Sequence, residues 1–127
     1  MRALVIDDSR VMRRIVASNL HSLGFETVEA ENGQAALDLL AAGEEVELAC
    51  IDWNMPVMDG LTFVTRVRAD EGLRSITLMM VTTESEHSQI VRALAAGAHE
   101  YLIKPFTPEA ISQKLELLGL VPAGEYA

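Results

Sequence analysis

Residues 48–52 read Leu48-Ala49-Cys50-Ile51-Asp52, four apolar residues that lead directly into a carboxylate. A short apolar run of this kind is consistent with a buried strand. Three further runs also lead into polar residues, Leu4–Ile6 into Asp7 and Asp8, Leu78–Val81 into Thr82, and Leu102–Ile103 into Lys104. If the runs are parallel strands, these polar residues all lie at the edge of the sheet where open α/β sheets bind ligands. Carboxylates, a hydroxyl and an ammonium gathered there indicate a site for magnesium and phosphate.

Segments with helical spacing lie between the apolar runs, and this alternation predicts an α/β fold with a parallel sheet covered by helices on both faces. We expect five strand–helix units, with Thr27–Ala30 as an edge strand because polar and apolar residues alternate along it. In the fourth helix, Ile90, Val91 and Leu94 are predicted to share one face. Five glycines follow the helices, where a left-handed C-cap favours glycine: Gly24, Gly43, Gly72, Gly97 and Gly119.

The composition indicates one domain with a substantial core, since the chain has 127 residues and is 50% hydrophobic. The formal net charge of -9 and the lack of a basic cluster argue against direct binding of nucleic acid. No apolar run is long enough for a signal peptide or a membrane span. The single cysteine, Cys50, lies within an apolar run, which favours a buried thiol in a reducing compartment. We therefore expect a soluble, cytoplasmic protein without a membrane partner.

The motifs at the predicted strand ends resemble those of the receiver domain of bacterial two-component response regulators. They are Ile6-Asp7-Asp8-Ser9, the loop from Asp52 to Gly60, Val81-Thr82, and Tyr101-Leu102-Ile103-Lys104-Pro105-Phe106. The loop, Asp52-Trp53-Asn54-Met55-Pro56-Val57-Met58-Asp59-Gly60, is most similar to the chemotaxis (CheY-like), single-domain type. The resemblance covers about residues 3–118 and implies a flavodoxin-like, doubly wound sheet in the order 2-1-3-4-5 with five helices. We expect the receiver domain over residues 1–119 and a short C-terminal tail over 120–127.

Three carboxylates would meet if Asp7 and Asp8 lie beside Asp52, and two like charges about 4 Å apart repel by roughly 4 kcal/mol at an effective dielectric constant of 20. The site therefore needs a cation. Mg²⁺ suits it, because this ion binds a few carboxylates and keeps several waters. The resemblance implies that these three residues and the backbone carbonyl of Asn54 hold Mg²⁺. Taken alone, Asp7-Asp8-Ser9 has an alternative interpretation as the cap of the first helix.

Asp52 is predicted to be the phosphoacceptor, since a carboxylate can act as a nucleophile and form an acyl phosphate. Lys104 supplies a compact charge that can neutralise a phosphoryl oxygen. Thr82 can donate a hydrogen bond to such an oxygen. The resemblance implies that the Lys104–Pro105 peptide is cis, and that the ring of Tyr101 turns inward when Thr82 moves toward the phosphoryl group. The alternative for Tyr101 is an exposed aromatic residue on an edge strand.

Asn54 and Glu84 stand two residues after Asp52 and Thr82, and the resemblance implies that they tune the rate of self-dephosphorylation. It also implies a histidine kinase as phosphodonor. A protein partner is expected to bind the face formed by the fourth helix, the fifth strand and the fifth helix. We expect a monomer, and dimerisation on phosphorylation is left open.

The predicted protein is a signalling switch that catalyses only its own phosphorylation and dephosphorylation. Two alternatives stay open at this point. The chain could be the receiver part of a longer regulator with a DNA-binding or enzymatic output. It could also be a small phosphatase that works through an aspartyl phosphate. Such an enzyme needs a general acid two residues after the nucleophile, where this chain has Asn54, and a lid over the substrate, for which the connections are short.

Overall fold

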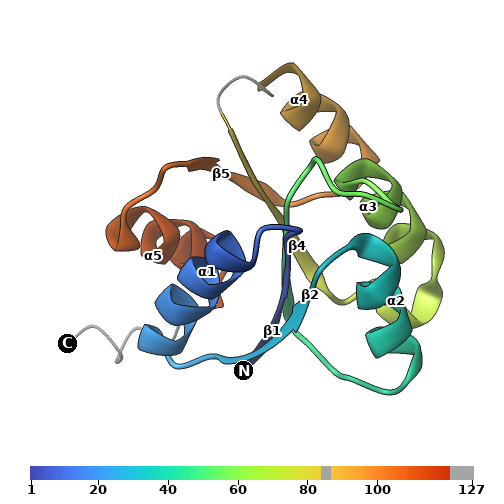
Figure 1. Cartoon of the computed structure of the whole chain (residues 1–127), viewed down its shortest axis with the longest axis horizontal. Helices are drawn as coiled ribbons and strands as arrows, with labels where there is room; N and C mark the ends of the chain where they lie inside the picture. Colours follow the sequence, from blue (N-terminus) through green and yellow to red (C-terminus); the bar gives the residue numbers. More distant parts are fainter. Residues whose placement is uncertain (84–86, 121–127) are drawn as a thin grey trace.

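A five-stranded parallel sheet forms the centre of the computed structural model, which describes residues 1–83 and 87–120 (Figure 1). The strands are β1 (Arg2–Ile6), β2 (Glu26–Ala30), β3 (Leu48–Ile51), β4 (Thr77–Thr83) and β5 (Glu100–Lys104). Their order in the sheet is β2-β1-β3-β4-β5. The flavodoxin-like order that the resemblance implied is confirmed, and β2 is an edge strand as expected.

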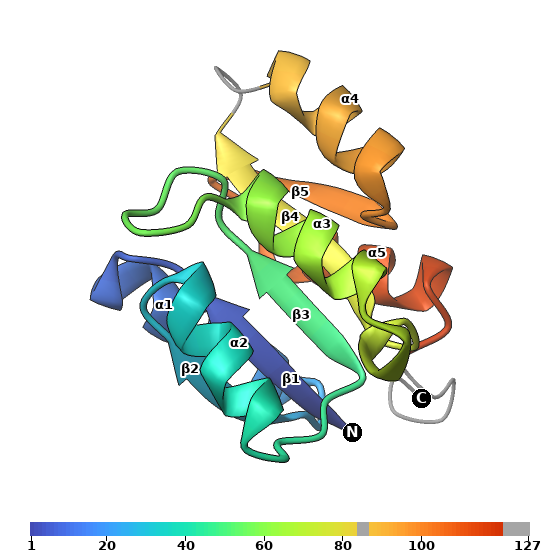
Figure 2. The same ribbon diagram turned by 90° about the vertical axis from the view of Figure 1, so that its right-hand side faces the viewer.

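Helices cover both faces of this sheet. They are α1 (Arg10–Ser22), α2 (Gly33–Ala41), α3 (Gly60–Ala69), α4 (His87–Ala96) and α5 (Pro108–Leu117), with a short 3₁₀ helix, η1 (Glu71–Leu73), after α3. Figure 1 shows α1 and α5 on one face, and Figure 2 shows α2, α3 and α4 on the other. None of the helices in the described part of the chain has the length and apolar character needed to cross a membrane.

Side chains with oxygen acceptors start four of the helices. The N-cap residues Ser9, Asn32, Asp59 and Thr107 each accept a hydrogen bond from a backbone N–H in the first turn of α1, α2, α3 and α5 respectively. Pro108 occupies the first turn of α5, where its missing N–H leaves no helical bond unmade. Within Asp7-Asp8-Ser9 the cap of α1 is therefore Ser9, which leaves the carboxylates of Asp7 and Asp8 available to the site.

The core consists of two clusters, one on each face of the sheet, because successive strand residues point to opposite sides. The cluster under α2, α3 and α4 includes Ile6, Ile51 and Phe63. The cluster under α1 and α5 includes Cys50 and Leu115. Burial raises the pKa of the Cys50 thiol to about 12, so it stays protonated, in agreement with the predicted buried thiol.

Two details of the helices differ from the prediction. In α4, Ile90 is buried together with Ala93, whereas Val91 and Leu94 are 62% and 37% exposed. The apolar spacing of this helix fits more than one face, and the small Ala93 packs inward in place of the larger residues. Gly72 lies within η1 rather than at a left-handed helix end. The other four glycines do have positive φ angles, as predicted: 93° at Gly24, 102° at Gly43, 124° at Gly97 and 71° at Gly119.

Candidate functional site

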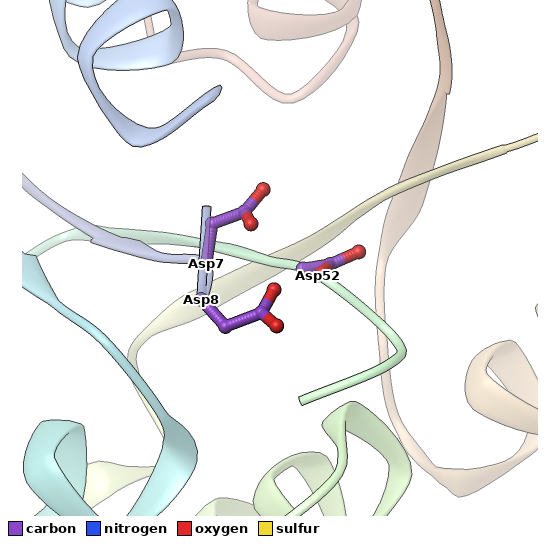
Figure 3. Close-up of side chains that lie close together, drawn as sticks. All are labelled: Asp7, Asp8 and Asp52. Atoms are coloured by element: carbon purple, nitrogen blue, oxygen red, sulfur yellow. The ribbon is translucent and has the colours of Figure 1, made fainter. Parts of the chain in front are cut away.

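Asp7 and Asp52 come together because β1 and β3 are parallel and in register. Ile6 pairs with Ile51, so the next residue of each strand lies at the same level of the sheet. One oxygen from each of Asp7, Asp8 and Asp52 lies within 4.8 Å of the others. Figure 3 shows the three carboxylates extending toward the same side from the ends of β1 and β3. Asp7 and Asp52 are buried and Asp8 is exposed, so the cluster opens to solvent on one side.

Lys104 completes this cluster from β5. Its Nζ lies 3.1 Å from Oδ2 of Asp7 and 3.3 Å from Oδ1 of Asp52. Thr83 pairs with Lys104 in the sheet, which brings the end of β5 level with the end of β4. The Lys104–Pro105 peptide is cis, as the resemblance implied. The predicted convergence of strand ends is therefore present for the acids and for the ammonium.

The acids and the lysine shift each other's pKa. Burial raises the pKa of Asp52 to about 6, and the charges of Asp7 and Asp8 act in the same direction, while Lys104 opposes them. Burial alone would lower the pKa of Lys104, but Asp52 and Asp7 outweigh it, and the pKa is raised. At neutral pH the site therefore holds ionised Asp52 beside a charged Lys104.

Asp7 is fixed in place by the start of α1. The Ser9 N–H donates to Oδ1 of Asp7 at 2.9 Å, and Nη1 of Arg13 donates to the Asp7 backbone carbonyl at 2.8 Å. Lys104 takes the other oxygen, Oδ2. Each oxygen of this buried carboxylate thus has a donor, and its orientation toward Asp52 is set before any ligand arrives.

The cluster fits a divalent cation by its donor set. Three carboxylates and one ammonium leave a formal charge of -2 when all are ionised. Carboxylate oxygens are hard ligands of the kind that Mg²⁺ prefers, and the exposure of Asp8 leaves room for the waters that Mg²⁺ keeps. Sulfur and imidazole are absent from the cluster, so the softer transition metals are disfavoured.

The loop after Asp52 is anchored by buried side chains. Trp53, Met55 and Met58 pack into the core cluster under α2, α3 and α4. Between them, the Met58 N–H donates to the Pro56 carbonyl at 2.7 Å and Val57 has a φ of 71°, which together form a tight γ-turn. The Gly60 N–H closes the loop by donating to the Trp53 carbonyl at 2.9 Å. The backbone beside the acids is thereby held by its own packing.

Thr82 lies near the end of β4, and Tyr101 is the second residue of the neighbouring strand β5. Thr82 is buried in β4, and Tyr101 is half-buried in β5, where it packs against the core cluster under α4. Met80 pairs with Tyr101 and Thr82 with Ile103, so Thr82 lies two residues closer to the site edge than the tyrosine does. Thr82 therefore lies at the edge of the sheet that carries the acid cluster, and Tyr101 lies further from that edge.

Two further residues, Asn54 and Glu84, were predicted to belong to the site. Asn54 is exposed in the loop, two residues beyond Asp52. Glu84 lies outside the described residues. Glu100 and Lys114, which belong to none of the sequence motifs, form an ion pair with an N–O distance of 3.0 Å beside Tyr101. Lys114 directly precedes the buried Leu115 in α5, and this helical phase is the signal that could have placed it toward β5.

Known proteins that are similar to this chain belong to a family consistent with this arrangement of acids and lysine. Residues 3–116 match the family described as response regulator receiver domain. A chemotaxis protein CheY homolog of Campylobacter jejuni is 46% identical over 128 residues, which cover 100% of this chain and 98% of that protein. Chemotaxis protein CheY1 of Helicobacter pylori is 44% identical over 119 residues, 93% of this chain and 96% of that protein.

Two solved structures that resemble this chain are also of response regulators. A probable two-component system response regulator/GGDEF domain protein superposes with a TM-score of 0.86 at 26% identity, over 94% of this chain and 50% of that chain. Chemotaxis protein CheY4 of Vibrio cholerae superposes with a TM-score of 0.82 at 34% identity, over 91% of this chain and 96% of that chain. The match over residues 3–116 and these relatives show that the chain belongs to the response regulator receiver domain family, and the two relatives named above are chemotaxis proteins of the CheY type.

Proposed function

We propose that this protein is a phosphorylation-activated receiver in which Asp52 accepts a phosphoryl group from a histidine kinase. The observation that carries the proposal is the position of Asp52, which lies with Asp7, Asp8 and Lys104 at the carboxyl edge of the sheet. The CheY-type relatives support a role in chemotaxis or a related phosphorelay.

Asp7, Asp8 and Asp52 would hold Mg²⁺ through their carboxylates, together with the backbone carbonyl of Asn54. Bound there, the ion would neutralise the carboxylates and draw phosphoryl oxygens toward Asp52. Asp7 is already oriented by Ser9 and Arg13, so this ligand needs no rearrangement. Asp8 is exposed and can adjust its position.

In the transfer, an oxygen of Asp52 forms a bond to phosphorus while the bond between phosphorus and the donor imidazole nitrogen breaks. The electron pair of that bond leaves with the nitrogen, which takes up a proton from solvent. Lys104 stays charged and turns from the carboxylates to a phosphoryl oxygen, to which it donates a hydrogen bond. Its present position, 3.3 Å from Asp52, makes this a short movement.

The switch would then follow from Thr82 and Tyr101. The hydroxyl of Thr82 donates to a phosphoryl oxygen that is absent before transfer, and the ring of Tyr101 fills the space that Thr82 leaves. The face formed by α4, β5 and α5 changes shape as a result and binds the output protein. Val91 and Leu94 support this assignment, because they place exposed apolar side chains on α4, the helix that connects β4 to β5.

Asn54 and Glu84 are proposed to tune how long the phosphoryl group remains, since both flank the path by which water reaches it. The receiver domain is assigned to residues 1–119 and a short tail to residues 120–127. We further propose that the protein acts as a monomer in the cytoplasm and binds neither nucleic acid nor a membrane directly.

A receiver domain within a longer regulator is the second candidate function. The response regulator/GGDEF protein supports it, because this chain spans only half of that one. The CheY-type relatives match this chain over 96% and 98% of their own lengths, which supports a role like theirs for the receiver domain itself. A phosphatase is disfavoured, because Asn54 stands where the general acid would be needed.

The experiment that tests the proposal separates a receiver from a phosphatase. The protein is incubated with Mg²⁺ and either labelled acetyl phosphate or p-nitrophenyl phosphate. A receiver carries no more than one phosphoryl group per chain at any time, loses it within seconds to minutes once acetyl phosphate is removed, and releases no nitrophenol from the ester. Continuous release of nitrophenol over many turnovers would identify a phosphatase instead. Replacing Asn54 with arginine should lengthen the life of the phosphoprotein, whereas Asn19→Arg on α1 should leave it unchanged.

A further inference from the structure

Glu100, Tyr101 and Lys114 form a connected group at the outer edge of the sheet. Nζ of Lys114, on α5, lies 3.0 Å from Oε1 of Glu100 and 4.5 Å from the centre of the Tyr101 ring. The same oxygen of Glu100 accepts a hydrogen bond from the Tyr101 backbone N–H at 3.0 Å. One carboxylate therefore holds both the backbone of Tyr101 and the ammonium that covers its ring.

The position of the ring follows from the sheet geometry. Glu100 and Tyr101 are adjacent in β5, so their side chains leave opposite faces of the sheet. Tyr101 packs against the core cluster under α4, while Lys114 comes from α5 on the other face (Figure 1). β5 is an edge strand, so a side chain from α5 can reach the ring only around this edge. The contact between Lys114 and the ring therefore lies at the rim of the sheet.

The contact is more shielded than an ordinary surface ion pair. The side chains of Lys114 and Glu100 are 26% and 21% exposed, whereas those of the Arg2–Glu26 pair are 40% and 79% exposed. A cation over an aromatic ring changes an equilibrium about two- to fivefold at exposed sites, so a change of at least this size is expected here. Glu100 keeps the ammonium at this position, so the two interactions act together.

We propose that Glu100 and Lys114 are positioning residues that hold the Tyr101 ring at the sheet edge and so set the resting state of the switch. This inference rests on the proposed function, in which the ring responds to phosphorylation of Asp52. When the ring turns inward it leaves Lys114, so the group stabilises the unphosphorylated state. By thermodynamic linkage, the same group weakens the binding of a phosphoryl mimic at Asp52.

The ring can be followed directly. The chain has two tyrosines, Tyr101 and Tyr126, so a Tyr126→Phe protein labelled with 3-fluorotyrosine gives one fluorine resonance. The protein is titrated with beryllium fluoride in the presence of Mg²⁺, as a stable mimic of the phosphoryl group. In the otherwise unchanged chain, we expect the resonance to move from a resting to a saturated position.

Lys114→Met and Glu100→Gln should each shift the resting resonance toward the saturated position and lower the midpoint of the titration by at least about two- to fivefold. The Lys114→Arg variant keeps the cation, so its resting resonance and the midpoint of its titration should equal those of the otherwise unchanged chain. Glu116→Gln removes a charge from an exposed position of α5 and should change neither.

The outcomes separate the two proposals. If the unchanged chain shows no response of the Tyr101 resonance to beryllium fluoride, the proposed switch is wrong. If the unchanged chain responds as expected but the Lys114→Met and Glu100→Gln variants have the same titration midpoint as that chain, the positioning role is overturned. A resonance displaced equally in the resting and saturated states, with no change of midpoint, would report only the lost charge and would also overturn that role.

Discussion

Nζ of Lys104 lies 3.3 Å from Oδ1 of Asp52, although 52 residues separate them in the sequence. The ammonium is shared with Asp7 at 3.1 Å, so one cation serves two buried carboxylates. Asp8 adds a third acid at the same place. The site therefore has an excess of negative charge until a divalent cation binds, and this excess determines how the protein should respond to mutation, pH and magnesium.

Asp52→Asn should raise the free energy of unfolding in the presence of EDTA at pH 7.5. The folded protein raises the pKa of Asp52 from 3.8 to about 6, so the ionised carboxylate is less favourable in the folded state than in the unfolded chain. This penalty appears as pH rises from about 4 and is fully present above about 6. Each pKa unit corresponds to about 1.4 kcal/mol, which sets roughly 2 to 3 kcal/mol as an upper limit for the gain.

Urea unfolding at pH 7.5 and pH 4 tests this prediction. The gain should be present at pH 7.5 and nearly absent at pH 4, where Asp52 is protonated in the folded state. Asp38→Asn, on the exposed surface of α2, is the control and should show no such difference. An Asp52→Asn protein that is less stable than the wild type at pH 7.5 would mean that the pairing with Lys104 outweighs burial.

Magnesium should change the fluorescence of Trp53. This is the only tryptophan in the chain; it directly follows Asp52 and is buried. A divalent cation bound by the acids alters the charge close to the indole, and a titration of the emission intensity measures its affinity. The Asp7→Ala, Asp8→Ala double variant should lose the response, while Asp38→Ala should keep it. An equal response in the double variant would place the cation elsewhere.

The positions of the acids and Lys104 could be predicted from the sequence, because the apolar runs show where each strand ends and parallel strands have those ends at one edge of the sheet. Asp7, Asp52 and Lys104 each stand at the end of an apolar run, and parallel pairing leaves them no other edge. The order of the strands came from the resemblance, since spacing alone does not determine which strands are neighbours.

Features that depend on packing between elements could not be predicted in this way. The apolar spacing of α4 identified a helix but not which of its apolar residues meet the sheet: Ile90 is buried, whereas Val91 and Leu94 are exposed. The ion pair of Glu100 with Lys114 joins a strand to a helix 14 residues away and depends on side-chain rotamers. No pattern of residue types marks such a contact in advance.

Gly60→Ala should destabilise the protein and slow phosphorylation. A Cβ at this position would lie 2.6 Å from the backbone oxygen of Asp52 and 3.1 Å from Cα of Trp53, so the backbone next to the acceptor must move. Such overpacking typically lowers stability by about 1 to 3 kcal/mol. Gly72→Ala is the matched control, since its closest neighbour is a side-chain oxygen of Asp70 at 3.3 Å. Equal stability of the two variants, measured by urea unfolding, would show that the loop accommodates the methyl group.

Thr82→Ala should still be phosphorylated, because Asp52, the metal ligands and Lys104 remain, but it should lose much of the phosphorylation-dependent gain in partner binding. If Thr82 and Tyr101 form one two-state element, their coupling is expected to be about 1 to 3 kcal/mol, or 5- to 150-fold in affinity. A double-mutant cycle with Tyr101→Ala measures it, once a pull-down with phosphorylated and unmodified protein has identified the partner. Losses that simply add would show that the two residues act separately.

The most direct test of the central claim is to locate the phosphoryl group. Wild type, Asp52→Asn and Asp38→Asn are incubated with labelled acetyl phosphate, each with Mg²⁺ and with EDTA. The wild type and Asp38→Asn should be labelled only with Mg²⁺, and Asp52→Asn should not be labelled, because an amide cannot form the acyl phosphate. Labelling of Asp52→Asn at the wild-type level, or labelling of the wild type that is unaffected by EDTA, would contradict a magnesium-dependent phosphoacceptor at Asp52.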